Sequence, residues 1–358
     1  METQIQPHRP EPVVLDDEPQ LVTKKTDFSE VATQLQASYQ AVINDEYPTG
    51  IRLLNHLKKR IFGTGKRGSY KGYRNLRSDY HEASNRLLIP VEDHKIAVPK
   101  APEIGWLEKL YPEENRFYLT LPQIQGLNSS WQWYQKGIQF PVLDQPVYPF
   151  YGTYFPTRFD HLILFDKWLT KYQGSKASAY DIGAGCGVLS FQLCKHGFDQ
   201  VFASDINPNA VISIQENARY LGVGNCISVQ VCDLFEKWEQ KADLIVFNPP
   251  WLPAGEEASG LDQAIYYPAD LFERFFDQAK EYLSDNGKLV VLFSNLGQTT
   301  GTQSHHPMDE ELEAHQRFRK IRVIKRKVKG GSKKTKRRNN RHQEYVELWE
   351  LEKWQKST

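Results

Sequence analysis

Apolar positions after Ala177 follow two alternating patterns along the chain. Short continuous apolar runs are typical of strands buried on both faces of a parallel sheet, and they predict strands at 177–181, 200–205, 227–231, 244–247 and 288–293. Between them, apolar residues recur at helical spacing, which predicts helices at 188–196, 208–221 and 269–283. Strands that alternate with helices in this way indicate a doubly wound, mostly parallel α/β sheet.

Two further strand-like runs, Ile321–Lys329 and Glu344–Leu351, follow a predicted helix that starts near Asp309. We expect them to form an antiparallel hairpin at the edge of the sheet, with residues 330–341 as its long basic loop. These two runs bring the predicted sheet to seven strands. The expected fold class is therefore a Rossmann-like α/β fold that ends in an antiparallel hairpin.

The first 147 residues carry weaker patterns. Residues 1–27 are rich in Pro, Glu, Asp and Gln and show no period, which indicates a disordered tail. Helical spacing predicts helices at Phe28–Ile43 and Thr49–Phe62. Residues 80–150 contain many prolines and aromatic residues in no clear period. We therefore expect an accessory domain of unassigned fold at 28–147, followed by the α/β domain at 148–353.

The fourth predicted strand ends abruptly in Asn248-Pro249-Pro250-Trp251. Two prolines remove two backbone donors and fix two φ angles, so the strand cannot continue and opens into a rigid loop. Ligands of open α/β sheets bind outside such carboxyl ends. The Asn248 and proline-linked carbonyls can accept both hydrogens of a planar NH2 group, and the Trp251 indole can stack on it. For this motif alone, a strand end with an Asn turn and a packed Trp is the alternative interpretation.

The first predicted strand runs from Asp181 into a turn with glycines at alternate positions, Gly183, Gly185 and Gly187. Glycines there let the backbone turn tightly and approach a ligand closely. A dinucleotide fingerprint would place its third glycine at Val188, where this chain has none. The Asp181 carboxylate would repel a pyrophosphate but attract an ammonium or sulfonium group, so the sign of charge favours S-adenosylmethionine over a dinucleotide.

Acidic residues also end the next two predicted strands. Asp205 ends the second strand and can accept hydrogen bonds from both hydroxyls of a ribose. Asp233 follows the third strand and can accept the exocyclic amine of an adenine. Each acid taken alone is typical of a helix cap or a surface charge. Three acids after three successive strands instead predict a site for S-adenosylmethionine, to which we also assign Ile206, Leu234 and Asn248.

The net charge of +1 conceals strong segregation of charge. Residues 51–78 contain nine Lys/Arg and no Asp/Glu, and residues 317–341 contain fourteen Lys/Arg and no Asp/Glu. Such segments can bind a phosphate backbone because Lys and Arg displace its counterions, and Tyr70 and Tyr73 can stack on bases. For the Gly-rich part of the first segment, taken alone, a solvated flexible loop is the favoured interpretation.

The four cysteines, at positions 186, 194, 226 and 232, match no zinc-ligand spacing. We expect four buried reduced thiols and no metal site, and the thiols indicate a cytoplasmic protein. No apolar run approaches the length of a membrane span, and residues 1–20 lack the apolar core of a signal peptide. We therefore expect no contact with a membrane.

Taken together, D-I-G-A-G-C-G at 181–187, Asp205, Asp233 and N-P-P-W resemble the motifs of class I S-adenosylmethionine-dependent methyltransferases. They are most similar to the branch whose fourth strand ends in [D/N]-P-P-[F/Y/W], the methyltransferase small domain. That branch includes adenine-N6 and guanine-N2 RNA or DNA methyltransferases and the release-factor glutamine methyltransferases. The resemblance covers residues 148–353, whereas residues 1–147 resemble no family that we can name.

The resemblance implies in-line transfer of a sulfonium methyl group to nitrogen, in which positioning supplies most of the rate. Its implied catalytic residues are Asn248, Pro249, Pro250 and Trp251. The segment at 148–161 is expected to pack beside this site and order it.

Three functions remain open. The first is methylation of an exocyclic amino group of a base in rRNA or tRNA, which the basic segments 51–78 and 317–341 favour. The second is methylation of a glutamine amide in a protein, which N-P-P-W would serve equally well. In that case the basic segments would contact a ribosome or an acidic partner. The third is a non-catalytic binding module of the same fold, which the intact glycines, acids and N-P-P-W argue against.

Overall fold

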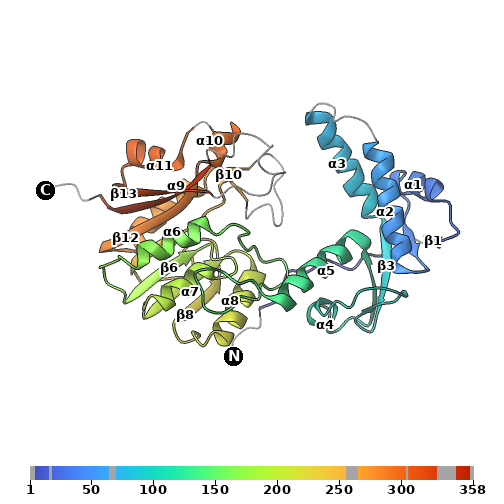
Figure 1. Cartoon of the computed structure of the whole chain (residues 1–358), viewed down its shortest axis with the longest axis horizontal. Coiled ribbons are helices and arrows are strands. Elements are labelled where there is room, and N and C mark those ends of the chain that lie inside the picture. The colour runs from blue at the N-terminus through green and yellow to red at the C-terminus, as the bar shows by residue number, and fades with distance from the viewer. Residues whose placement is uncertain are drawn as a thin grey trace. The chain divides into compact units, whose positions relative to one another are not determined.

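The computed structural model describes residues 5–15, 18–63, 70–254, 265–303, 305–328 and 344–354, and only the backbone of residues 70–74. The chain divides into two compact units, one formed by Arg9–Gln135 and the other by Lys136–Thr358 with Met1–His8 (Figure 1). The larger unit starts before the predicted boundary at residue 148, because Ile138 pairs with Val147 and both pack into its core.

A seven-stranded sheet forms the centre of the larger unit, in the order β13-β14-β12-β9-β6-β7-β8. Neighbouring strands are parallel except at β14, which runs antiparallel to β12 and β13. The strands are β6 (Ser178–Ile182), β7 (Gln200–Asp205), β8 (Ile227–Val231), β9 (Ala242–Phe247), β12 (Leu283–Ser294), β13 (Phe318–Lys327) and β14 (Tyr345–Lys353). The predicted Rossmann-like sheet with a C-terminal antiparallel hairpin is confirmed.

Helices cover both faces of this sheet (Figure 1). One core joins it to α6 (Asp160–Leu169), α7 (Val188–Lys195) and α8 (Pro208–Tyr220), and the other joins it to α9 (Leu271–Tyr282). Shorter elements lie between and after these: β10 (Leu252–Pro253) and β11 (Tyr266–Tyr267) precede α9, and α10 (Leu296–Thr300), α11 (Pro307–Glu310) and a π-helix η2 (Glu311–His315) follow β12. None of the described helices has the length and apolar character that crossing a membrane requires.

Strand β9 shows why the apolar runs are continuous. Its Leu244 and Val246 pack into the core beneath α6, α7 and α8, whereas Ile245 and Phe247 pack into the core beneath α9. All four are at most 3% exposed. Side chains alternate between the faces of a strand, so a strand covered on both faces needs an apolar residue at every position.

The smaller unit contains a five-stranded sheet in which β3 lies between β2 and β4 and also pairs with β5. Its strands are β1 (Gln20–Val22), β2 (Ala41–Ile43), β3 (Leu87–Glu92), β4 (Lys95–Ile96) and β5 (Arg116–Thr120). Its helices are α1 (Phe28–Gln36), α2 (Tyr47–Phe62), α3 (Tyr70–Ser84), α4 (Trp106–Leu110) and α5 (Leu121–Lys136). The fold of this unit could not be assigned from the sequence.

Two predictions for the N-terminal part differ from the structure. The helix predicted at Phe28–Ile43 ends at Gln36, because Ser38 adopts a positive φ and Ala41–Ile43 pairs with its neighbours as strand β2. The backbone of 70–84, partly predicted as a flexible loop, forms α3, while 64–69 lie outside the described residues.

The predicted disordered tail at 1–27 also differs from the structure. It contains strand β1, which pairs with β2, and upstream of it the Val13 amide donates to the Tyr118 carbonyl at 2.8 Å. The Tyr111 hydroxyl donates to the Pro10 carbonyl at 2.6 Å, and Arg9 forms an ion pair with Glu114. A Pro-rich segment with no periodicity of its own is therefore held by partners far along the chain.

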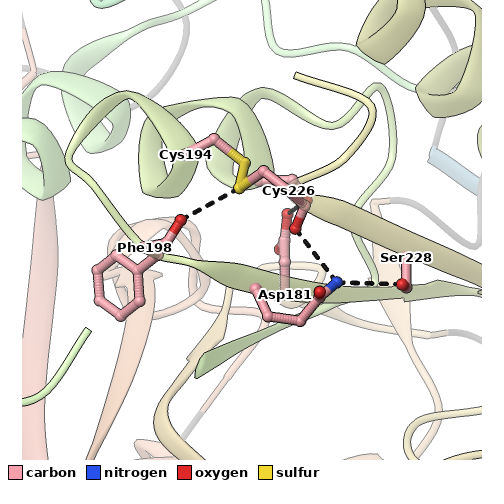
Figure 2. Close-up of a disulfide and its surroundings, with 7 residues drawn as sticks. Asp181, Cys194, Phe198, Cys226 and Ser228 are labelled. Carbon is pink, nitrogen blue, oxygen red and sulfur yellow. Dashed lines mark hydrogen bonds between the residues drawn. A yellow bond between two sulfur atoms is a disulfide. The ribbon is translucent and has the colours of Figure 1, made fainter. Parts of the chain in front are cut away.

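The interpretation of all four cysteines as reduced thiols is wrong for two of them. Cys194 and Cys226 form a disulfide with 6.2 Å between their Cα atoms, and Figure 2 shows them meeting. The disulfide joins the end of α7 to the residue before β8. The spacing of the two cysteines in the sequence does not reveal that they lie next to each other. Cys186 and Cys232 are free and buried, as predicted. The disulfide removes the thiol argument for a cytoplasmic compartment.

We expect reduction of this disulfide to lower the free energy of unfolding by about 3–4 kcal/mol, because the crosslink closes a loop of about 30 residues in the unfolded chain. Urea unfolding with and without reductant measures the change. The double variant Cys194→Ser/Cys226→Ser serves as the control, since reductant should not affect it. Equal stability of the wild type in both conditions would contradict the prediction.

Candidate active site

The predicted site residues come together at one edge of the large sheet. The strands that carry them are adjacent in the order β9-β6-β7-β8, and all four run parallel. Their registers align the carboxyl ends: Asp181 pairs with Val246 of β9, and Asp205 pairs with Val231 of β8. The turn after β6, the acid that ends β7, the acid after β8 and the N-P-P-W loop after β9 therefore share one edge.

The glycines of the turn after β6 all adopt positive φ angles, of 63°, 54° and 82° at Gly183, Gly185 and Gly187. A Cβ atom added at Gly185 would lie 3.2 Å from the Tyr154 carbonyl oxygen, and one at Gly187 would lie 2.9 Å from Ile214 Cγ1. Any side chain there would therefore be both strained and crowded. Gly183 is exposed, so the backbone of the turn is open to a ligand.

Asp205 is fixed by the backbone around it. Its Oδ2 accepts a hydrogen bond from the Gly185 amide at 2.8 Å, and its Oδ1 accepts one from the Asn207 amide at 2.9 Å. Burial raises the pKa of Asp205, and these two hydrogen bonds oppose the rise. The next residue, Ile206, is 54% exposed. A fixed carboxylate beside an exposed apolar side chain suits a ribose and the flat base attached to it.

Asp181 is buried and has one unused oxygen. The Ser190 hydroxyl donates to Oδ2 at 2.5 Å, whereas Oδ1 has no hydrogen-bond partner among the described residues. Burial raises the pKa of Asp181 to about 7, although the Ser190 hydrogen bond opposes the rise. A buried acceptor without a partner is costly, and a cationic ligand would satisfy it.

Asp233 has a partner that the sequence did not predict. Arg274 of α9 donates to its Oδ2 at 2.6 Å and also contacts Asp270 at 2.8 Å. Leu234 adopts a positive φ of 46° and is 5% exposed. The carboxylate of Asp233 is therefore oriented by an arginine, with its other oxygen left to accept an amine.

The N-P-P-W loop is organised by a hydrogen bond within itself. The Trp251 indole Nε1 donates to Asn248 Oδ1 at 3.2 Å. The carbonyl oxygen keeps a second lone pair that can accept from a ligand. Trp251 is half-buried and packs against both hydrophobic cores. The loop thus holds the Asn248 carbonyl and the Trp251 ring in a fixed mutual geometry.

His161 lies beside this loop, and sequence reasoning missed it. It is 3% exposed, and its ring meets the Trp251 ring edge-on, with centroids 5.4 Å apart and an interplanar angle of 87°. Burial lowers the pKa of His161 to about 4, although the charge of Asp160 opposes this. Helical spacing with Leu164 and Trp168 could have predicted its burial, but nothing in the sequence indicated its contact with Trp251.

The segment before α6 packs beside the site, as expected. The Tyr154 carbonyl approaches Gly185 closely, and the Phe150 amide donates to Ser213 of α8 at 3.2 Å. Arg158 forms an ion pair with Glu344 at 2.8 Å, and Asp160 forms one with Arg326 of β13 at 3.0 Å. These ion pairs tie the segment to β13 and to the residue that precedes β14.

Most described cations of the basic segment 317–341 already have carboxylate partners. Ion pairs with acidic residues engage Arg317, Arg319, Arg322, Lys325 and Arg326. Much of this charge therefore stabilises the hairpin and its surroundings. The predicted loop at 330–341 lies outside the described residues. Within the described ranges, no group of three or more His, Cys, Asp or Glu side chains is arranged to hold a metal ion.

Comparison with known proteins gives a family match over the region that carries the site. A model of the family described as "Methyltransferase small domain" matches residues 163–327. A putative protein N5-glutamine methyltransferase of Methanocaldococcus jannaschii is 32% identical over 147 residues, which are 39% of this chain and cover 73% of that protein.

Two further matches are more limited. A release factor glutamine methyltransferase of Streptococcus pneumoniae is 30% identical over 135 residues, which are 34% of this chain and only 48% of that protein. The solved structure of a putative RNA methyltransferase from Pyrococcus horikoshii covers 54% of this chain and 81% of its own, with 18% identity and a TM-score of 0.36.

Proposed function

Because this chain belongs to the methyltransferase small domain family and is a methyltransferase, we propose that it transfers the methyl group of S-adenosylmethionine to the nitrogen of a planar NH2 group. The observation that carries the proposal is the Asn248 carbonyl, fixed by the Trp251 indole at the end of β9. That pair lies on the sheet edge that also carries Asp181, Asp205 and Asp233.

The residues of this edge fit the cofactor that the family generally uses. Asp181 Oδ1, which is buried and has no hydrogen-bond partner in the described part of the chain, would receive the ammonium group, and its negative charge would favour the sulfonium. The two oxygens of Asp205 would accept the ribose hydroxyls, with Ile206 against the adenine ring. Asp233, oriented by Arg274, would accept the adenine amine. When bound, S-adenosylmethionine supplies an electrophilic methyl group on sulfur.

The chain's own contribution to the reaction is positioning. The lone pair of an amide or aromatic amine is delocalised, so such a nitrogen is a poor nucleophile. Asn248 Oδ1 and the Pro249 carbonyl accept its hydrogens and turn its lone pair toward the methyl donor. Trp251 holds the plane of the group. Holding the reactants in line can account for several kcal/mol of the barrier.

An exocyclic amine of an RNA base is the acceptor that the charge of the smaller unit favours. Lys58 and Lys59 on α2 and Arg77 on α3 are exposed, and none has a carboxylate partner among the described residues. Cations without acidic partners are available to phosphates. A glutamine amide is the second candidate, which the two curated relatives named above favour.

Transfer of tritium from labelled S-adenosylmethionine tests the function directly. Extract of cells that lack the gene is incubated with the protein and then separated into RNA, DNA and protein. Label in the RNA supports the first acceptor. Label in protein that is released as methylamine on alkaline hydrolysis supports the glutamine amide. Absence of label from every fraction would overturn the proposed function.

For the RNA acceptor, we expect Lys58→Glu/Lys59→Glu to weaken RNA binding about tenfold or more and to flatten its dependence on salt, because phosphate contacts release counterions. Filter binding at several salt concentrations measures both effects. Lys24→Glu/Lys25→Glu is the matched control, an exposed lysine pair outside the basic segments. Equal loss of binding in the two variants would show that only net charge matters and would count against a specific surface on α2.

A further inference from the structure

One face of α2 carries an amide, two lysines and an aromatic ring, opposite to the buried leucines of the helix. Asn55 lies three and four residues before Lys58 and Lys59, and Phe62 lies four and three residues after them, so the helical repeat places all four on one face. Asn55 and both lysines are exposed, and Phe62 is half-buried. With Gly63, these residues line a cavity of about 510 Å³. Charge alone would bind phosphates, but it requires neither the ring, the amide nor the cavity.

The Phe62 ring is held in place beside the cations. It contacts the Tyr80 ring of α3, with centroids 5.9 Å apart and an interplanar angle of 56°. Lys58 and Lys59 precede it by one turn of α2, and the exposed Arg77 precedes Tyr80 by one turn of α3. A ring that is already fixed loses little freedom when a flat group stacks on it. A fixed ring among cations therefore suits a flat ligand that carries negative charge.

A nucleotide with an unpaired base has the chemistry that this face requires. Its base can stack on the Phe62 ring, and its phosphates can contact the lysines. The Asn55 amide offers a donor and an acceptor, which suit the edge of a base. In a duplex the bases stack on one another and their edges are paired, so they cannot reach a ring on the protein. An acidic segment of a protein would satisfy the lysines, but carboxylates provide no flat group for Phe62.

Resting on the RNA acceptor of the proposed function, we propose that this face of α2 binds an unpaired nucleotide of the RNA substrate. The base stacks on Phe62, Asn55 binds the edge of the base, and Lys58 and Lys59 bind the flanking phosphates. The base that is methylated binds at the N-P-P-W loop, so this nucleotide is a second contact with the same RNA. The smaller unit thereby selects RNA with a loop or single-stranded stretch over a continuous duplex.

Two single-stranded probes separate base stacking from charge. One is an oligoadenylate of about 12 nucleotides, and the other has the same phosphates but lacks the bases of its central nucleotides. We expect the wild type to bind the complete probe about tenfold more tightly, measured by fluorescence anisotropy. Phe62→Leu should bind both probes equally, with the affinity that the wild type has for the abasic one. Phe62→Trp keeps a ring and should keep the preference, which shows that stacking is needed at this position.

The dependence on salt distinguishes the ring from the lysines. Phe62→Leu should weaken binding of the complete probe by the same factor at every salt concentration, because stacking releases no counterions. Lys58→Glu/Lys59→Glu should instead flatten the dependence on salt and keep the preference for the complete probe. Tyr39→Leu is the matched control, since Tyr39 is a 65% exposed aromatic residue of the same unit outside the basic segments. That variant should bind both probes as the wild type does.

Three results would overturn the inference. They are equal affinity of the wild type for the complete and abasic probes, equal affinity for a hairpin duplex and the complete single strand, and competition by polyglutamate as strong as by RNA of equal charge. The last result would assign this face of α2 to an acidic protein. If tritium labels RNA but the probes bind equally, the proposed function stands and only this inference fails. If tritium labels protein alone and the wild type binds no RNA, the RNA acceptor itself fails.

Discussion

Asn248→Ala is expected to lower the single-turnover rate of methyl transfer by at least about a hundredfold, because the acceptor nitrogen loses the carbonyl that orients its lone pair. The variant also frees the Trp251 indole, whose Nε1 donates to Asn248 Oδ1 at 3.2 Å. The acceptor NH2 group and the Trp251 ring that stacks on it are therefore both misaligned in this variant. The affinity for S-adenosylmethionine should change little, because the groups assigned to its charged and ribose parts lie on β6 and β7.

Rapid-quench measurement with labelled S-adenosylmethionine gives the rate, and calorimetry gives the affinity. Asn248→Asp is the matched control, since aspartate keeps an oxygen that accepts from Trp251 and from the acceptor. We expect it to retain far more activity than Asn248→Ala. If Asn248→Ala transfers methyl groups at a rate close to the wild type, the assignment of the N-P-P-W loop to the acceptor is wrong.

The fold of the larger unit was predictable because its signals are local. A parallel strand covered on both faces must be apolar at every position, and β9 shows this with four consecutive buried residues. The Gly-rich turn and Pro208, at the first turn of α8, mark boundaries through backbone chemistry that each residue carries by itself. The carboxyl ends of adjacent parallel strands meet at one edge of the sheet. For this reason the sequence alone could also predict that the three acidic residues lie close together.

What the sequence did not reveal depends on distant pairs. The Cys194–Cys226 disulfide follows from the order of strands in the sheet, and the Arg274–Asp233 ion pair joins α9 to the turn after β8. Neither pair of residues has a spacing in the sequence that belongs to a recognisable motif. Cations of the C-terminal hairpin were interpreted as a contact for RNA, but carboxylates of its own and neighbouring elements engage many of them. A run of one charge along the sequence does not tell which charges are neutralised in space.

In the smaller unit, the strands were missed for a different reason. Strands β1 and β2 have three residues each, too few to show an alternating pattern. Strand β2 is held by pairing with β3, and β1 by pairing with β2. Upstream of them, the segment around Val13 is held by a carbonyl of β5. Such short strands are stable only because they pair with neighbouring strands. The composition of residues 1–27 therefore predicted disorder, although the structure has the edge of a sheet there.

The Asp181→Asn variant is expected to be more stable than the wild type and worse at binding its cofactor. Burial raises the pKa of Asp181 from an ordinary carboxyl value to about 7 in the folded protein. Below about pH 4 the residue is protonated in both states. As the pH rises to about 7 the unfolded chain ionises first, so the wild type loses up to about 4 kcal/mol of stability that the uncharged variant keeps.

Urea unfolding between pH 4 and pH 8 should therefore show a stability advantage of Asp181→Asn that grows up to about pH 7 and then levels off. The affinity for S-adenosylmethionine at pH 8 should fall about tenfold or more, because a charge-assisted hydrogen bond to the cofactor is lost. Asp243→Asn is the matched control: Asp243 lies on β9, and both of its oxygens already accept hydrogen bonds, from Ser175 and Ser284. That variant should gain no stability and bind the cofactor normally. A less stable Asp181→Asn protein, or one with unchanged cofactor affinity, would mean that the buried carboxylate serves the fold and not the ligand.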